Sequence, residues 1–181
     1  YLIQSYRRSD GHRDDADGRL TTCFGRLGYD LSQRWHINLI FNRTDNWAKD
    51  PGPDTPSAHN DGTFKTNDNF TVATLSNHYE RAEGYVKTYW ENGHIDWVDQ
   101  FDSDTGENNS DTLTYYDNYG IRIRETLKPW EGGKILGGFD LDYISGEVDF
   151  ITGANPAEHF DRETFHLISP YVAISHRFGS D

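Results

Sequence analysis

The stretch from Tyr119 to Gly146, "YGIRIRETLKPWEGGKILGGFDLDYISG", decides the fold of this chain. Apolar and charged side chains alternate on both sides of a central turn, and a period of two residues is typical of a β-strand with two different faces. One face carries Tyr119, Ile121, Ile123, Phe139, Leu141 and Tyr143, and the other carries Arg122, Arg124, Asp140 and Asp142. The pattern predicts two antiparallel strands joined by "KPWEGG".

The alternation also predicts the register of this hairpin. If paired residue numbers sum to 262, Ile123 lies opposite Phe139, Ile121 opposite Leu141, and Arg122 opposite Asp140. Apolar pairs on one face and opposite charges on the other are both favourable cross-strand combinations. A slip by one residue would mix the two faces, so we expect this register to be strongly specified.

The rest of the chain has the same character, with almost no helix signal. Clusters of Gly, Asn, Asp and Pro separate segments that are rich in β-forming residues. The expected strands are 1–8, 19–31, 34–46, 69–81, 84–97, 112–127, 134–146 and 162–178. The connections at 9–18, 47–68, 98–111 and 147–161 are long and polar, whereas those at 32–33, 81–84 and 128–133 are short.

This alternation of long and short connections indicates the architecture. In an up-and-down sheet every second connection lies at the same end, so one end carries long loops and the other tight turns. Outer-membrane barrels have that asymmetry. We therefore predict an all-β fold: an antiparallel up-and-down β-barrel or barrel segment of about eight strands, formed by residues 1–181 as a single domain. Tryptophans near both ends of the strands are typical of the aromatic girdles of such barrels, with Trp35 and Trp130 at the turn end and Trp47 and Trp97 at the loop end.

Composition excludes several classes of protein. Aromatic residues make up 14% of the chain, which a disordered acidic polypeptide would lack. The net charge of −13 and the absence of basic clusters argue against nucleic acid as a partner. No run approaches the roughly 18 apolar residues of a membrane helix. The single cysteine, Cys23, cannot form an intrachain disulfide and is expected to be an inert side chain.

Four segments together resemble the barrel portion of TonB-dependent outer-membrane receptors: "SYRRSDGHRDDADGR", "LGYDLSQRWHINLIFNRTDNWAKDPG", "YGIRIRETLKPWEGGKILGGFDLDYISGE" and "ISPYVAISHRF". The resemblance implies a larger barrel in the outer membrane of a Gram-negative bacterium. It also implies import of a scarce nutrient, such as an iron–siderophore complex or cobalamin, energised by the TonB complex through an N-terminal plug. The sequence contains no plug-like segment, so we expect it to be a fragment of the barrel without energised transport of its own.

On this interpretation Ile121, Ile123, Phe139 and Leu141 face lipid, whereas Arg122, Arg124, Asp140 and Asp142 line the lumen. The long loops would face outside and contact the small-molecule or metal-chelate ligand. Two alternatives stay open: a soluble β-sandwich or small barrel that binds carbohydrate, and a porin-like passive channel. The edge strands of a fragment would invite closure or pairing with another copy.

The sequence offers only weak candidates for chemistry. Asp102, Asp104 and Asn108 lie in a loop that loosely resembles a calcium loop but lacks the final bidentate Glu. The eight histidines form no close metal-binding pair. No phosphate-binding loop or serine-nucleophile elbow is present. We therefore expect neither an enzyme nor a bound cofactor.

Overall fold

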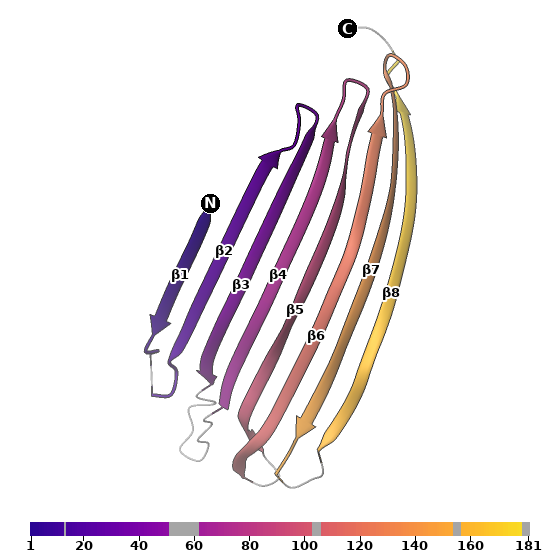
Figure 1. Ribbon diagram of the computed structural model, residues 1–181. Coiled ribbons are helices and arrows are strands. Elements are labelled where there is room, and N and C mark those ends of the chain that lie inside the picture. The colour runs from indigo at the N-terminus through magenta and orange to yellow at the C-terminus, as the bar shows by residue number, and fades with distance from the viewer. Residues whose placement is uncertain (13, 51–61, 103–105, 154–156, 179–181) are drawn as a thin grey trace.

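The computed structural model describes residues 1–12, 14–50, 62–102, 106–153 and 157–178, without the side chains of residues 102, 107 and 108. They form one antiparallel sheet whose eight strands lie side by side in chain order (Figure 1). The strands are β1 (Leu2–Ser9), β2 (Gly18–Asp30), β3 (Trp35–Asp50), β4 (Gly62–His78), β5 (Ala82–Asp102), β6 (Glu107–Leu127), β7 (Gly133–Ile151) and β8 (Glu158–His176). The prediction of an all-β, up-and-down fold of eight strands is confirmed.

The sheet has two distinct ends. At the turn end, short connections at 31–34, 79–81 and 128–132 join the strands where short connections were predicted, although β4 ends at His78 and not at residue 81. At the loop end the strands run further than predicted, so that β5 and β6 are joined only through residues 103–106. These extensions are rich in Asp, Asn, Glu and Lys but also contain apolar side chains such as Phe64, Val148 and Phe150, and their polar content predicted loops. The connections at the loop end are therefore shorter than predicted. The two ends of the sheet differ less in connection length than the sequence indicated.

The predicted register of the β6–β7 hairpin is confirmed. Ile123 pairs with Phe139, Ile121 with Leu141 and Arg122 with Asp140. Because successive side chains of a strand point to opposite sides, this register defines two faces of the whole sheet. We call them the isoleucine face, which carries Ile121 and Ile123, and the arginine face, which carries Arg122 and Arg124.

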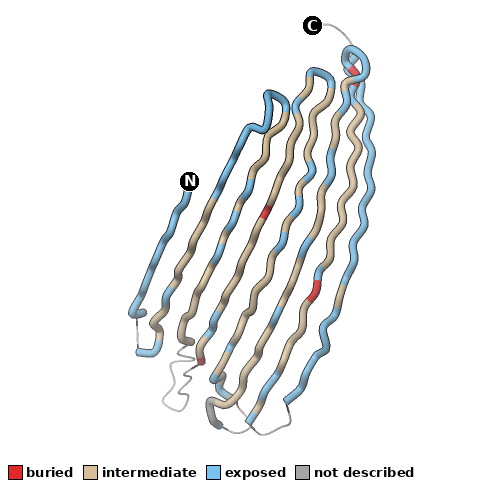
Figure 2. The backbone as a smooth tube through the Cα atoms, viewed as in Figure 1, coloured by how far each residue is buried: buried red, intermediate tan, exposed pale blue. Residues whose placement is uncertain are grey.

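This sheet has no buried core. Among the described residues Val72 is the only buried hydrophobic side chain, at 8% exposure (Figure 2). The accessible surface is 12418 Å² for a chain of 20.8 kDa. A compact protein of that mass exposes about 8,900 Å². The apolar side chains therefore lie on the surface of a single layer, where another phase or another molecule must cover them.

The eight strands do not close into a barrel. β1 and β8 are the two edges of the sheet and do not pair with each other. Pro170, which cannot donate a backbone hydrogen bond, lies in edge strand β8 and is tolerated there. Pairing of the two edges with further strands stays a prediction. The described residues also contain no helix long and apolar enough to cross a membrane.

Candidate functional site

The isoleucine face carries two neighbouring rows of apolar side chains that run across the sheet perpendicular to the strands. Neither row contains a charged residue, and Thr88 is the only polar member. The first row is Leu27, Leu39, Ala73, Thr88, Ile121, Leu141 and Ile168. The second row, nearer the turn end, is Tyr29, Ile37, Leu75, Val86, Ile123, Phe139 and Pro170.

A row of aromatic rings borders this apolar band on the side of the loop end. Tyr119 and Tyr143 stack with ring centroids 4.4 Å apart, and His166 meets Tyr143 edge-on at 5.1 Å. The Trp90 ring is 48% exposed, and its Nε1 donates a hydrogen bond to Asp117 Oδ1 at 2.7 Å. The complete row is Leu2, Gly25, Phe41, Thr71, Trp90, Tyr119, Tyr143 and His166.

Polarity changes abruptly one row further toward the loop end. The next row on the isoleucine face is polar except for Cys23: Gln4, Cys23, Arg43, Asn69, Asn92, Asp117, Ser145 and Thr164. The row after it is Tyr6, Thr21, Asp45, Asn67, His94, Tyr115 and Glu147. We call these two rows the polar rows. The isoleucine face is thus apolar toward the turn end and hydrophilic toward the loop end, with aromatic rings at the boundary.

The turn end has its own aromatic groups. Trp35 Nε1 donates to Tyr79 Oη at 3.0 Å, and Trp130 Nε1 donates to His176 Nδ1 at 3.1 Å. One carboxylate interrupts the isoleucine face here: Glu125 accepts hydrogen bonds from Asn77 Nδ2 at 3.1 and 3.3 Å. Trp35 and Trp130 therefore occupy the turn end, as predicted. Trp47 and Trp97 do not form the boundary at the other end, because Trp47 lies beyond the polar rows and Trp97 is on the arginine face.

The arginine face carries a hydrogen-bonded charged cluster in the middle of the sheet. Arg122 Nη1 donates to Asp142 Oδ1 at 2.6 Å, and its Nε lies 3.7 Å from Asp140 Oδ2. Tyr89 Oη also donates to Asp142 Oδ1, at 2.5 Å, by lying across Gly120. The predicted lumen residues Arg122, Asp140 and Asp142 are therefore joined in one network on the face opposite Ile121 and Leu141. Arg124 is on the same face but makes no ion pair among the described residues.

Tyrosines lie across glycines at two further places on the arginine face. Tyr116 crosses Gly93 and donates to Asp68 Oδ1 at 2.7 Å. Burial, together with this bond to the carboxylate, raises the pKa of Tyr116 above its ordinary value. Tyr171 covers Gly138 in the same way. Each ring fills space that a Cβ atom would occupy, so these glycines are required by close packing of a neighbouring strand's ring.

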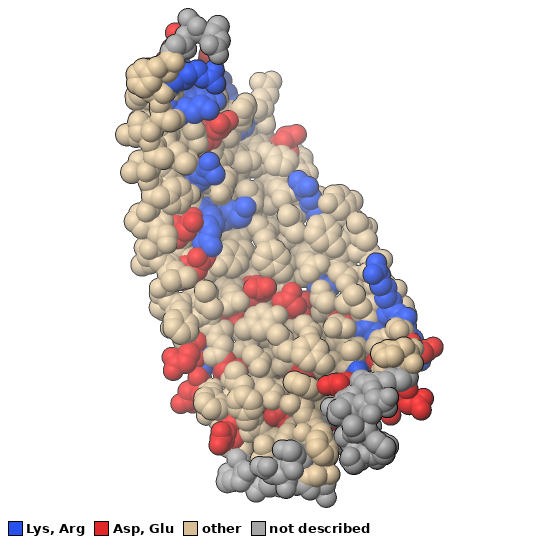
Figure 3. Space-filling view, turned by 180° about the vertical axis from the view of Figure 1, so that it is seen from behind, with Lys and Arg blue, Asp and Glu red and all other residues tan. Residues whose placement is uncertain are grey.

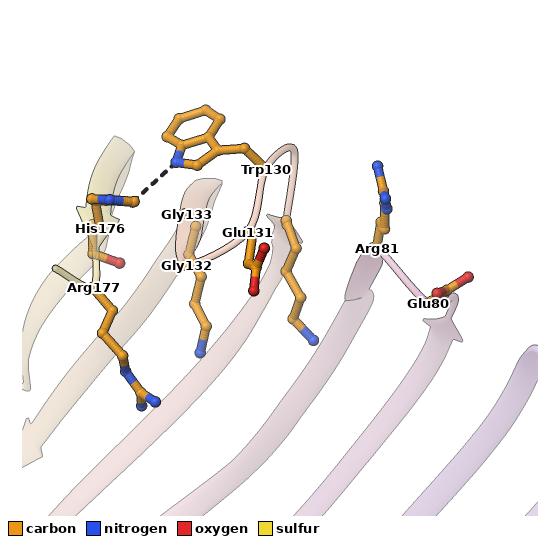
Figure 4. A pocket seen from close by; sticks show the side chains of 11 residues that line it. Glu80, Arg81, Trp130, Glu131, Gly132, Gly133, His176 and Arg177 are labelled. Carbon is orange, nitrogen blue, oxygen red and sulfur yellow. Dashed lines mark hydrogen bonds between the residues drawn. The ribbon is translucent and has the colours of Figure 1, made fainter. Parts of the chain in front are cut away.

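A wide pocket of about 1250 Å³ opens at the turn end, between the connection at 79–81, that at 128–132 and the end of β8 (Figure 4). Basic side chains dominate its lining, with Arg81, Lys128, Lys134 and Arg177 against Glu80 and Glu131. Lys128 is 3.7 Å from Glu83, whereas Lys134 and Arg177 have no ion pair among the described residues. The pocket is open to solvent, and most of its lining residues are polar or charged.

Charge differs between the two ends of the sheet. Acidic side chains gather toward the loop end, as Figure 3 shows from the side opposite to Figure 1. They include Asp45, Asp50, Asp68, Glu91, Asp96, Asp111, Asp117, Glu147 and Asp149. Arg81, Lys128, Lys134 and Arg177 gather at the turn end. The loop end of the sheet is therefore more acidic than the turn end.

The weak metal candidates are not brought into a site by the described residues. Asp104 and the side chains of Asp102 and Asn108 lie outside them, and only the backbone pairing of Asp102 and Asn108 in β5 and β6 is defined. Within the described part of the chain, no group of three or more His, Cys, Asp or Glu side chains is arranged to hold a metal ion. Cys23 is half-buried and carries a free thiol.

Comparison with known proteins gives no assignment: no family model, no curated protein and no solved structure matches this chain.

Sequence reasoning missed the aromatic row because its members come from separate strands. Trp90, Tyr119, Tyr143 and His166 have no common spacing in the chain, and only the registers between strands bring them into line. The hairpin register was predictable and already aligned Tyr119 with Tyr143. Predicting the registers of β5 and β8 in the same way would have placed Trp90 and His166 in this row as well.

Proposed function

We propose that this sheet is part of the wall of an outer-membrane β-barrel, with the isoleucine face against lipid and the arginine face toward the lumen. The observation that carries the proposal is the exposed apolar band bordered by the aromatic row. Leu27, Ile168 and Val172 on this face are 65%, 63% and 72% exposed. Exposed apolar side chains are stabilised when they are shielded from water, and lipid hydrocarbon can shield them without a second protein layer.

The height of the band agrees with this placement. From the aromatic row at Tyr119 to Leu127, which lies beyond Glu125 and is the last apolar residue of β6 on this face, a strand rises about 26 Å at about 3.3 Å per residue. A strand tilt of about 40° reduces that rise to about 20 Å, near the apolar band of about 25 Å in known outer-membrane barrels. The polar rows then fall among the headgroups of one leaflet. Glu125, near the other boundary, is held by Asn77 and flanked on both sides by Gly84 and Gly137.

The finer proposal is that the parent barrel is a TonB-dependent receptor that imports a scarce nutrient, such as an iron–siderophore complex or cobalamin. The sequence resemblance supports it, as does a sheet of eight long strands that stays open and so leaves room for a larger barrel. The Arg122–Asp142 network and the basic pocket at the turn end would line the path of the nutrient. The TonB complex would act through a plug, and the loop end would meet the ligand first.

A soluble carbohydrate-binding module is the second candidate. One observation favours it: Trp90 and Tyr119 are 48% and 47% exposed beside amide side chains, an arrangement that can stack on a sugar ring. In that case a second layer, and not lipid, would cover the apolar rows.

Two neighbouring residues of β8 distinguish these candidates. Ile168 is on the isoleucine face and Ser169 on the arginine face, and both are exposed. The chain is refolded into phosphatidylcholine vesicles, and its free energy of unfolding is measured by urea titration. We expect Ile168→Arg to lower it by about 2–4 kcal/mol, as a cation at the bilayer midplane does, and Ser169→Arg to leave it nearly unchanged. A chain that stays monomeric in buffer without lipid, and in which both variants behave alike, would contradict membrane placement.

A further inference from the structure

We propose that Glu125 and Asn77 form a binding site for a protonated primary amine, and that its occupant is the ethanolamine headgroup of a phospholipid in the leaflet at the turn end. This inference rests on the proposed membrane placement and adds a ligand to it. The site is on the isoleucine face, in the row formed by Trp35, Asn77, Gly84, Glu125, Gly137 and Val172.

Glu125 is a carboxylate in an otherwise uncharged part of the sheet. Among the described strand residues of the isoleucine face, from the aromatic row to the turn end, no other Asp, Glu, Lys or Arg occurs. The Glu125 carboxylate accepts hydrogen bonds from Asn77 but has no cationic partner within the described part of the chain. A charged group in an apolar band is destabilising unless it is paired, so Glu125 favours a cation that comes from outside the sheet.

Asn77 orients this carboxylate. Its Nδ2 donates to Glu125 Oε2 at 3.1 Å and to Oε1 at 3.3 Å, whereas its Oδ1 is buried and has no hydrogen-bond partner among the described residues. An unsatisfied buried acceptor is destabilising, so stability alone does not explain an asparagine at this position. The two hydrogen bonds hold the carboxylate over Gly84, where a Cβ atom would lie 2.2 Å from Glu125 Oε2.

Gly137, the partner of Glu125 in β7, leaves an open position on the other side of Glu125. A Cβ atom at Gly137 would meet nothing within 4 Å, so neither close packing nor a positive φ requires glycine there. Its neighbours on this face are Ile135, Phe139 and Val172. An open position between apolar side chains and a carboxylate residue suits an ammonium group that is attached to an alkyl chain.

The depth of the site favours a lipid headgroup as the occupant. Glu125 is in the same row as Trp35, and tryptophan rings at the end of a membrane-spanning strand lie at headgroup depth. An ethanolamine headgroup brings an ammonium group with three N–H donors to this depth, while its acyl chains lie along the apolar band. A choline headgroup has the same charge but no N–H donor. A lysine of another protein carries the same ammonium group, but the lipid already belongs to the phase that covers this face.

A matched pair of variants on opposite faces tests the site. Glu125→Gln removes the charge and keeps the shape, and Glu83→Gln does the same on the arginine face at the same end, where Lys128 Nζ lies 3.7 Å from Glu83 Oε1. Gly137→Val fills the open position and leaves Glu125 and Asn77 in place. The full chain is refolded into vesicles of phosphatidylcholine and phosphatidylethanolamine, and the lipid retained after gentle detergent extraction is measured by mass spectrometry. A further arm adds free phosphoethanolamine to the buffer.

We expect the unmodified chain and Glu83→Gln to retain phosphatidylethanolamine over phosphatidylcholine by about tenfold, the effect of one hydrogen bond to a charged group. Glu125→Gln and Gly137→Val should both lose this preference. Insertion of the unmodified chain without any preference would overturn this inference and leave the proposed membrane placement intact. An equal loss in Glu83→Gln, or a preference that free phosphoethanolamine abolishes, would also overturn it. Failure to insert into any vesicle would instead contradict the proposed function.

Discussion

Tyr119 and Tyr143 stack across β6 and β7 with their ring centroids 4.4 Å apart and their planes 15° from parallel. This pair is the centre of the aromatic row, and it separates Ile121 and Leu141 on one side from Asp117 and Ser145 on the other. A change from two mainly apolar rows to a mainly polar row, across one row of rings, is the main chemical division of the molecule. Amphipathic rings are favoured at such a boundary because each has an apolar body and a polar tip.

The stacked pair should be energetically coupled. Offset aromatic pairs contribute about 0.5–1.5 kcal/mol beyond the area that they bury. We expect a double-mutant cycle with Tyr119→Leu and Tyr143→Leu, measured by urea unfolding in vesicles, to give a coupling energy in that range. The Tyr115→Leu and Tyr143→Leu pair is the control, because Tyr115 contacts His94 and not Tyr143. An equal coupling in both cycles would argue against the stacked contact as its source.

Two glycines in neighbouring strands should respond differently to alanine. A Cβ at Gly120 would lie 2.5 Å from Tyr89 Cε1 and 2.6 Å from the Leu141 carbonyl oxygen, whereas one at Gly137 would meet nothing within 4 Å. Gly120→Ala must displace Tyr89 from Asp142, and we expect a loss of about 1–3 kcal/mol in unfolding free energy. Gly137→Ala should be neutral or stabilising by up to about 1 kcal/mol, because it restricts the unfolded chain. Similar losses at both positions would mean that Tyr89 does not pack across Gly120.

The loop end of the β7–β8 hairpin should be more stable in acid than in base. A hydrogen bond to the Asp149 carboxylate raises the pKa of His159 above its ordinary value. A raised folded-state pKa gives stabilisation that is fully present below the unfolded-state pKa and is lost as pH rises through the folded-state pKa. We expect slower amide exchange near His159 at pH 5.5 than at pH 8.5, after correction for the intrinsic rate. His159→Gln should remove this difference, and its persistence in that variant would assign it to another group.

The fold was largely predictable, because one hairpin contains the whole pattern. The alternation of Ile121, Arg122 and Ile123 fixed strand type, register and the two faces, and the same period appears in most strands. The extra lengths of β4, β5 and β6 at the loop end, residues 62–68, 98–102 and 107–111, were missed, because polar residues such as Asn67 and Ser110 dominate them and were interpreted as loop.

The candidate sites were only partly predictable. Arg122 and Asp140 were expected together because they are directly opposite in the hairpin. Tyr89 was not expected there, because its reach to Asp142 depends on Gly120 in the strand between them. The polar rows were not expected either, because Asn69, Asn92 and Asp117 become neighbours only through two strand registers. Contacts between three or more strands require registers that a single sequence does not specify locally.

Opposite environments for Ile123 and Arg124 are the central claim, and spin labels at these two adjacent positions test it most directly. Both side chains are exposed and on opposite faces of β6. Cys23 is first replaced by Ser, and a nitroxide is attached at Ile123→Cys or Arg124→Cys in vesicle-inserted protein. Collision rates with oxygen, which concentrates in the bilayer, and with a water-soluble nickel chelate are then compared. We predict that the label at position 123 collides preferentially with oxygen and the label at 124 with the nickel chelate. Preferential collision with the nickel chelate at both positions would contradict the account.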